Sequence, residues 1–291
     1  MERAGEPVAK KSCNMSVKLS RIQIGYSGQA RCPPHNKNLM YCGMRILPVA
    51  KIMRDLSYPN FGEFLIMTII LTNDDGIDAP GIQALLQAVT SKTIMVAPKG
   101  QWSGCGHQVT AQSPIHLDRR SPVEYAVGGT PADCVRIALN HICPKPDFVL
   151  SGINAGGNLG VDVYISGTVA AVREAAMHGI PGIAISHWIK NPWEIDWEIA
   201  TRWTSRVLAD LLNREQKSGC FWNVNLPHLA PGSAEPEIVF CRPSTQPLPL
   251  VYRQEGEYFH YAGEYGKRDR ALGTDVDVCF GGNISVTEIS L

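Results

Sequence analysis

From residue 67 onward, short apolar runs alternate with longer amphipathic segments. Residues 68–72 (TIILT) form a β-branched apolar run of strand length, and the acidic turn NDDG follows at once. This pattern is typical of a buried strand. Pro80 and Gly81 then open a segment with apolar residues at helical spacing, which predicts an amphipathic helix with proline in its first turn. We expect further strands at residues 93–97, 148–150, 180–185 and 221–226, and further helices at residues 131–142, 167–178 and 193–214.

The alternation of strands and helices indicates the fold class. Strands joined by helices imply right-handed crossovers and a mostly parallel sheet that helices cover on both faces. We therefore expect an α/β, Rossmann-like three-layer fold. After Pro227 the spacing becomes irregular and rich in proline, and residues 252–261 then predict a β-hairpin. The C-terminal region is accordingly expected to be irregular apart from this hairpin.

The first 66 residues differ from the rest of the chain. They carry ten Lys and Arg residues against four Asp and Glu residues, which leaves 17 against 23 for residues 67–291. They also show no sustained hydrophobic period, and they lack the apolar core of a secretory signal. We interpret residues 1–66 as an N-terminal extension that is either disordered or translated from an upstream start codon, with Met67 then the native start. Because the segment is basic and poor in acidic residues, a transit peptide is the alternative. Residues 67–291 form the one predicted domain.

Composition narrows the classes of function. Of the 291 residues, 44% are hydrophobic and 19% are charged, as in ordinary globular proteins. No stretch approaches the roughly 20 apolar residues that cross a bilayer, and the net acidic residues 67–291 hold no basic stripe. We expect neither a membrane nor a nucleic acid as partner. The nine cysteines form no CxxC pair and no zinc-finger spacing, so we interpret them as reduced thiols of a cytoplasmic protein.

Three polar, glycine-rich segments follow predicted strands, at residues 73–76, 98–107 and 151–158. The carboxyl ends of parallel strands meet at one edge of a sheet, where ligands bind, so the three segments can converge. The adjacent carboxylates Asp74 and Asp75 repel each other unless a cation or a shared proton compensates. With a Ser hydroxyl and an Asn carbonyl they offer only oxygen, which suits Mg²⁺, Mn²⁺ or Ca²⁺ rather than zinc. The alternative for NDDG is a solvated turn.

The helix expected from Gly167 onward begins with the sequence SGTV. Free N–H groups at a helix start bind anions, and the hydroxyl of Ser166 or Thr168 can add a hydrogen bond to a phosphate. In the alternative interpretation, Ser166 only caps the helix. A divalent metal ion beside such a helix start is the arrangement that phosphate-ester hydrolysis needs. His107 is a candidate to stabilise or protonate a leaving oxygen, or else a histidine that only packs or forms hydrogen bonds.

Six motifs occur in order: ILTNDDGIDAPGIQAL, VAPKGQWSGCGHQVT, GGTPADCV, PDFVLSGINAGGNLG, SGTVAAVREA and GTD. Together they resemble the SurE family of survival-protein nucleotidases. The resemblance implies a metal-dependent phosphatase that acts on nucleoside 5′-monophosphates, often on 3′-monophosphates and, in some members, on short polyphosphate. It also implies one divalent metal ion per subunit, either Mg²⁺ or Mn²⁺.

The resemblance also implies roles for single residues of this chain. The implied metal ligands are Asp74, Asp75, Ser103 and Asn154. The residues that it places at the phosphate are Asn158, Ser166, Gly167 and Thr168. His107 stands at a loop position where many members have the same residue. We therefore take Asp74, Asp75 and His107 as candidate catalytic residues, and the sequence leaves open which aspartate acts as base.

The chain departs from the family pattern in places. Many members have Tyr directly before the serine of SGT, whereas this chain has Ile165 there and Tyr164 one place earlier. Gln108 stands where the family often has Ser. The sequence does not continue into the exchanged C-terminal helix of many members, so the predicted hairpin is the element that we expect to form a homodimer or homotetramer.

Two other classes of function are alternatives for this sequence. A nicotinamide-dependent oxidoreductase is one, but the first strand is followed by NDDGID and not by GxGxxG. A non-catalytic nucleotide-binding stress sensor is the other, and the complete set of candidate metal ligands speaks against it.

Overall fold

A computed structural model of the chain describes residues 67–190 and 193–291. The prediction of an N-terminal extension falls on residues 1–66, which lie outside the described residues. No helix in the described ranges is both long enough and apolar enough to cross a membrane.

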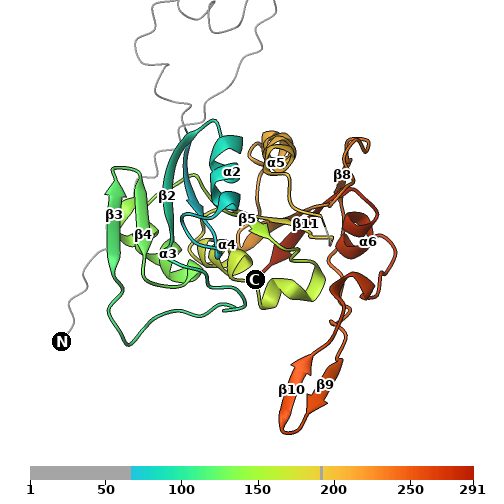
Figure 1. Cartoon of the computed structure of the whole chain (residues 1–291). Coiled ribbons are helices and arrows are strands. Elements are labelled where there is room, and N and C mark those ends of the chain that lie inside the picture. Colours follow the sequence, from blue (N-terminus) through green and yellow to red (C-terminus); the bar gives the residue numbers. More distant parts are fainter. Residues whose placement is uncertain (1–66, 191–192) are drawn as a thin grey trace, which may run out of the picture. The chain divides into compact units, whose positions relative to one another are not determined.

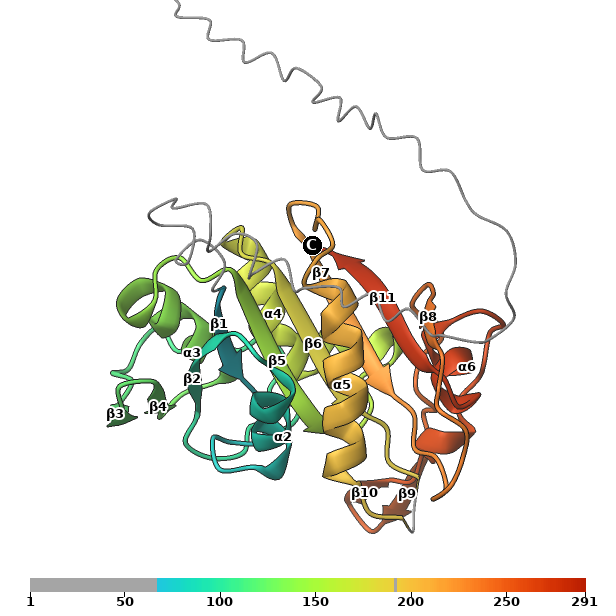
Figure 2. The ribbon, with the colours of Figure 1, turned by 90° about the horizontal axis from the view of Figure 1, so that it is seen from above.

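A nine-stranded sheet forms the centre of the fold (Figures 1 and 2), with the spatial order β3-β4-β2-β1-β5-β6-β7-β11-β8. Its neighbouring strands run parallel except in the pairs β3–β4 and β7–β11. The mostly parallel sheet that the sequence predicted is therefore confirmed. The strands are β1 Thr68–Thr72, β2 Lys92–Pro98, β3 Leu117–Ser121, β4 Glu124–Val127, β5 Phe148–Ala155, β6 Gly182–His187, β7 Cys220–Leu226, β8 Ile238–Phe240 and β11 Ile284–Ser290.

Helices cover both faces of the sheet. Helices α2 (Pro80–Ala88) and α5 (Trp197–Leu211) pack on one face, and α3 (Pro131–Ile137) and α4 (Gly167–Met177) pack on the other (Figure 2). Helices are needed on both faces because the side chains of the central strand β1 point alternately to one face and to the other. Ile69 and Leu71 join the core under α2 and α5, whereas Ile70 joins the core under α3. The three-layer expectation is confirmed.

Side-chain caps set where three of these helices begin. Thr130 and Asp133 form a capping box at α3, in which the hydroxyl of Thr130 accepts a hydrogen bond from the N–H of Asp133. Ser166 caps α4 through the N–H of Val169. Asp196 caps α5 through two N–H groups, and α5 therefore starts at Trp197 and not at residue 193 as predicted. The predicted helix over residues 131–142 is α-helical only to Ile137 and continues as a π-helical segment, Ala138–Ile142.

The C-terminal region contains more regular structure than the sequence predicted. The expected hairpin is present as β9 (Tyr252–Glu255) and β10 (Tyr258–Tyr261), which project away from the sheet (Figure 1). A short helix, α6 (Asp275–Phe280), follows, and β11 then returns to the sheet between β7 and β8. Strand β11 is antiparallel to β7 and parallel to β8, so β11 and β8 run in the direction opposite to the central strands.

Candidate functional site

The turn after β1 presents two carboxylates at the edge of the sheet. The side chain of the buried Asn73 closes this turn, because its amide donates to the carbonyl of Gly76 at 2.7 Å and its oxygen accepts from the N–H of Gly76 at 3.2 Å. Gly76 has a φ of 106°, a conformation that favours glycine. The rigid turn therefore holds Asp74 and Asp75 at the carboxyl end of the central strand.

Asp74 is buried, and only 4% of its surface is exposed. Its Oδ1 accepts a hydrogen bond from the hydroxyl of Thr168 on α4, which ties the β1 turn to that helix. Burial raises the pKa of Asp74 to about 6, and the neighbouring carboxylate of Asp75 adds to the increase, while the hydrogen bond from Thr168 opposes it. A cation beside Asp74 would remove this penalty.

Asp75 lies beside Asp74 and is only half-buried. Its Oδ2 accepts a hydrogen bond from the N–H of Ala155 at 3.2 Å, and burial raises its pKa. Oδ1 of Asp75 has no hydrogen-bond partner within the described part of the chain. It is therefore available to a ligand.

The other two predicted ligands come from neighbouring segments. Asn154 lies near the end of β5, and its amide nitrogen donates to the carbonyl of Gly156 at 2.7 Å, which leaves its side-chain oxygen for another partner. The hydroxyl of Ser103 accepts from the side chain of Gln101 at 2.8 Å. Both residues line one cavity of about 360 Å³ together with Asp74 and Asp75. The predicted convergence of the three segments is thus observed, and we call this space the catalytic cavity after the candidate catalytic residues Asp74 and Asp75.

The donors around the catalytic cavity fit a hard divalent ion. Two carboxylates, one hydroxyl and one amide oxygen supply oxygen alone, which Mg²⁺ and Mn²⁺ prefer. In the described ranges, His, Cys, Asp and Glu side chains form no cluster of three or more that could hold a metal ion. The raised pKa of the buried Asp74 is a second observation that favours a cation beside the four oxygen donors.

The residues predicted at the phosphate divide into two groups. Asn158 and Ser166 line the catalytic cavity, whereas Gly167 and Thr168 are not among its lining residues. Thr168 instead donates its hydroxyl to Asp74, a contact that the sequence did not predict. Gly167 packs closely on Asp74 as well. A Cβ added at Gly167 would lie 2.8 Å from Cβ of Asp74.

Hydrogen bonds at both ends hold Asn158 in place. Its side-chain amide donates to the hydroxyl of Ser186 on β6 at 2.7 Å. Its carbonyl accepts from the side chain of Asn223 at 2.8 Å, and its N–H donates to the side chain of Asn225 at 2.8 Å. All three partners are buried, so the loop after β5 has a fixed position on β6 and β7.

His107 belongs to the same loop as Ser103 but does not line the catalytic cavity. Its Nε2 lies 2.8 Å from a carboxylate oxygen of the buried Glu174 on α4, and Nδ1 lies 3.4 Å from the guanidinium of Arg173. His178 and Arg136 contact the other oxygen of Glu174 at 3.0 and 3.4 Å. These three contacts keep the pKa of Glu174 below its usual range even though burial acts in the opposite direction. The catalytic role of His107 stays a prediction.

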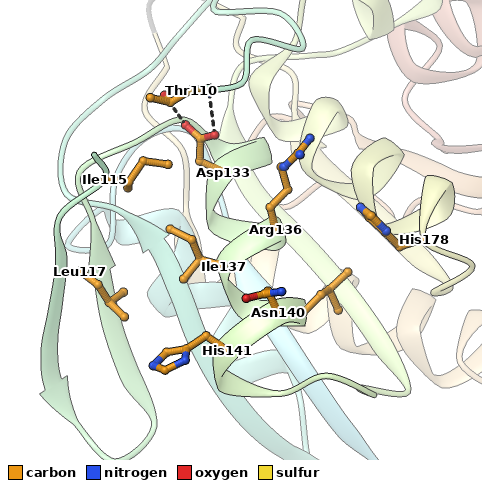
Figure 3. A pocket seen from close by; sticks show the side chains of 10 residues that line it. Thr110, Ile115, Leu117, Asp133, Arg136, Ile137, Asn140, His141 and His178 are labelled. Carbon is orange, nitrogen blue, oxygen red and sulfur yellow. Dashed lines mark hydrogen bonds between the residues drawn. The ribbon is translucent and has the colours of Figure 1, made fainter. Parts of the chain in front are cut away.

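A wider groove lies next to this cluster and is lined partly by α3 and the π-helical segment (Figure 3). Its volume is about 580 Å³, and none of the predicted site residues lines it. The carboxylate of Asp133 faces Thr110 there and accepts hydrogen bonds from the N–H of Thr110 at 2.9 Å and from its hydroxyl at 2.7 Å. Asp133 therefore anchors the loop that carries Ser103 and His107 at Thr110, three residues after His107.

The catalytic cavity is also lined by residues outside the three predicted segments, among them Asp162, Leu248 and Tyr265. The hydroxyl of Tyr265 donates to Asp162 at 2.6 Å, and the guanidinium of the buried Arg268 donates to the same carboxylate oxygen at 2.6 Å. This buried pair attaches the segment after the hairpin to the loop that carries Asn158. Its members are separated by 106 positions in the sequence, so no local pattern could have indicated it.

Comparison with known proteins identifies relatives of this chain. Residues 69–247 match the family model described as survival protein SurE. A protein from Nostoc sp. is 65% identical over 224 residues, which cover 77% of this chain and 99% of that protein. The 5′-nucleotidase SurE of Paramagnetospirillum magneticum is 36% identical over 80% of this chain and 94% of its own length. The crystal structure of the SurE protein from Aquifex aeolicus matches with a TM-score of 0.69 and 32% identity, and the match covers 77% of this chain and 93% of that one. This chain belongs to the SurE family.

Proposed function

We propose that this protein is a metal-dependent phosphohydrolase that releases phosphate from nucleoside 5′-monophosphates. The observation that carries the proposal is the single cavity at which Asp74, Asp75, Ser103 and Asn154 meet the start of helix α4. The name 5′-nucleotidase of the Paramagnetospirillum relative supports the choice of substrate. We extend the proposal to 3′-monophosphates and to short polyphosphate, since the same groups would bind their terminal phosphate.

In this proposal the four oxygen donors hold one Mg²⁺ or Mn²⁺ ion. When bound, such an ion neutralises phosphate charge and lowers the pKa of a bound water. The start of α4 reaches the cavity at Ser166 and favours the phosphate there, because the first N–H groups of a helix have no partner within it and the positive helix end attracts an anion. Asn158 and Ser166 orient the phosphate from the wall of the cavity.

Asp75 is the aspartate that we assign as general base. Each aspartate has one oxygen held by a hydrogen bond, Asp74 by Thr168 and Asp75 by the N–H of Ala155. Asp75, however, is only half-buried, whereas Asp74 is buried, so a water molecule reaches the free oxygen of Asp75 more easily. Oδ1 of Asp75 can therefore take the proton of the attacking water. Leu248, Ile165 and Tyr265 line the same cavity and face the sugar and base in this proposal.

The test is phosphate release from 5′-AMP and 3′-AMP with Mn²⁺ or Mg²⁺, repeated in excess EDTA. We expect release that EDTA abolishes, and at least a roughly 100-fold lower kcat for Asp75→Asn with an unchanged circular dichroism spectrum. Activity of Asp75→Asn equal to that of the unmodified protein would contradict the proposed site. Binding of AMP without phosphate release would instead favour the nucleotide sensor.

We also propose that the protein works in the cytoplasm as a homodimer or homotetramer. All six cysteines of the described residues are free, as expected of a reducing compartment. The hairpin of β9 and β10 exposes Tyr252, Tyr258, Phe259 and Tyr261. Aromatic groups clustered on a projecting element are typical of a protein interface, and a second copy of this chain is the partner that we propose.

A further inference from the structure

A second cavity lies beyond the ends of β6 and β7, on the side of the sheet that α5 covers. It has a volume of about 420 Å³, within the usual range of small-molecule sites. Ser186 and His187 are consecutive residues at the end of β6, and consecutive side chains of a strand face opposite sides. Ser186 supports Asn158 of the catalytic cavity, whereas His187 lines the second cavity. The two cavities therefore use opposite faces of the same strand end.

Aromatic rings form the walls of this second cavity. His187 stacks on Trp203 with 6.5 Å between the ring centroids, and it meets His228 edge to face at 5.2 Å. Trp193 contacts His228 at 5.6 Å and lies at the rim, where it is 37% exposed. Such walls bind flat rings through stacking and edge-to-face contacts.

The hydrogen bonds of the two histidines leave one free acceptor. The ring nitrogen Nδ1 of His187 lies 2.7 Å from the carbonyl of Trp188, so Nδ1 carries the proton and Nε2 is an acceptor. In the described ranges Nε2 of His187 has no hydrogen-bond partner, and it is not among the fully buried atoms. In contrast, His228 accepts from the N–H of Lys190 at 2.9 Å and donates to the carbonyl of Glu194 at 3.2 Å.

His187 remains a neutral acceptor at physiological pH. Burial lowers the pKa of His187 to about 4. The ring that lines this cavity therefore carries no charge that could attract a phosphate.

The charges at the rim also disfavour a phosphate. Three acidic residues, Glu194, Asp196 and Glu235, line the cavity, whereas Arg202 is the one arginine among the described residues of its lining. Arg202 is paired with Glu235. Anions are consequently repelled, whereas an uncharged ring that offers an N–H group finds both a surface and an acceptor. This chemistry differs from that of the catalytic cavity.

We propose that the second cavity binds an uncharged nucleoside, whose base lies against the aromatic walls and donates an N–H hydrogen bond to Nε2 of His187. The choice of a nucleoside rests on the proposed function, because a nucleoside is the product of nucleotide dephosphorylation. Nothing else in the proposal depends on catalysis. The protein would thus carry a product-binding site separate from the site of reaction.

Isothermal titration of the full-length protein in excess EDTA tests this proposal without turnover. The probes are adenosine and N6,N6-dimethyladenosine, which has the same rings but lacks the exocyclic N–H group. His187→Phe keeps an aromatic ring and removes the acceptor. We expect this substitution to weaken adenosine binding by about tenfold and to leave binding of the dimethyl analogue unchanged.

Two further variants complete the experiment. Asp75→Asn, in the catalytic cavity, should bind adenosine like the unmodified protein. Trp193→Leu removes an exposed ring, so it should fold normally and weaken both probes; it replaces His187→Phe if that variant does not fold. The proposal is overturned if the unmodified protein does not bind adenosine, if His187→Phe binds both probes as before, or if Asp75→Asn abolishes binding.

The outcome is independent of the phosphatase assay. If adenosine binding depends on His187 but the protein releases no phosphate from AMP, the nucleoside site is supported and the proposed function is contradicted. If phosphate release is found without such binding, the proposed function stands and the nucleoside site fails.

Discussion

Replacement of Asp74 by asparagine should stabilise the protein while it abolishes activity. The folded protein holds the pKa of this buried carboxyl at about 6, compared with 3.8 for an ordinary aspartate. Each unit of pKa difference between the folded and unfolded states corresponds to about 1.4 kcal/mol, so the ionised carboxylate costs ~3 kcal/mol of folding free energy at neutral pH. Asparagine is uncharged and keeps an oxygen that can accept the hydrogen bond from Thr168.

Because the pKa of Asp74 is raised in the folded protein, the stabilising effect of Asp74→Asn should grow as the pH rises. Below pH 3.8 the carboxyl of Asp74 is protonated in both the folded and the unfolded state, so no free energy is spent on burying a charge. As the pH rises toward 6, the unfolded chain loses its proton before the folded chain does, so the unmodified protein loses stability. Asp74→Asn should therefore match the unmodified protein near pH 4 and exceed it by ~3 kcal/mol at pH 8.

The assay is urea unfolding followed by tryptophan fluorescence, in EDTA, at several values of pH. Asp78→Asn is a matched control, because Arg120 lowers the pKa of the exposed Asp78 and the loss of that pair should slightly reduce stability. Saturating Mn²⁺ should reverse the order of Asp74→Asn and the unmodified protein, since only the latter keeps both carboxylates. A difference that does not change with pH, or a less stable Asp74→Asn at pH 8, would refute the reasoning.

Three further predictions concern the surroundings of the catalytic cavity and the hairpin. Gly167→Ala places a Cβ 2.8 Å from Cβ of Asp74, so we expect kcat for AMP to fall by about tenfold or more, measured as phosphate release. Glu174→Gln weakens the contact with His107 and should cost ~1–3 kcal/mol in urea unfolding at pH 7. Because the pKa of Glu174 is lowered, this cost should shrink as the pH falls below the usual range of a glutamate, and a cost that is constant with pH would argue against the ion pairs. Phe259→Ser on the hairpin should shift the mass in light scattering toward the monomer, and an unchanged mass would remove the hairpin from the interface.

Local pattern was sufficient to predict the central part of the fold. The apolar run of β1 is buried on both faces, so its sequence carries a clear strand signal, and the segments after β1, β2 and β5 meet because parallel strands end at one edge. In contrast, β3 has the polar sequence LDRRS and lies at the edge of the sheet, where no continuous apolar run is required. Edge strands of this kind give a weak signal.

Contacts between distant residues could not be predicted. Thr168 was expected at the phosphate but donates to Asp74, 94 positions away, because the packing of α4 against the β1 turn decides the direction of its hydroxyl. Tyr265 is held at the cavity by its hydrogen bond to Asp162, beside the Asp162–Arg268 ion pair. It begins a 3₁₀ helix of only three residues, Tyr265–Lys267, which is too short to give a periodic pattern in the sequence. Sequence reasoning thus named the groups that we propose to hold metal and phosphate, but it did not name Asp162, Leu248 or Tyr265 in the lining of the cavity.

The attachment of Tyr265 to Asp162 also bears on how such a site can change during evolution. The match to the family model ends at residue 247, whereas Tyr265 and its anchor Arg268 lie beyond it. Of the residues proposed to face the sugar and base, Leu248 and Tyr265 therefore come from a later stretch of the gene than the groups proposed for chemistry. Substitutions in the later stretch can alter selectivity among substrates while the earlier stretch, and with it the reaction, is preserved.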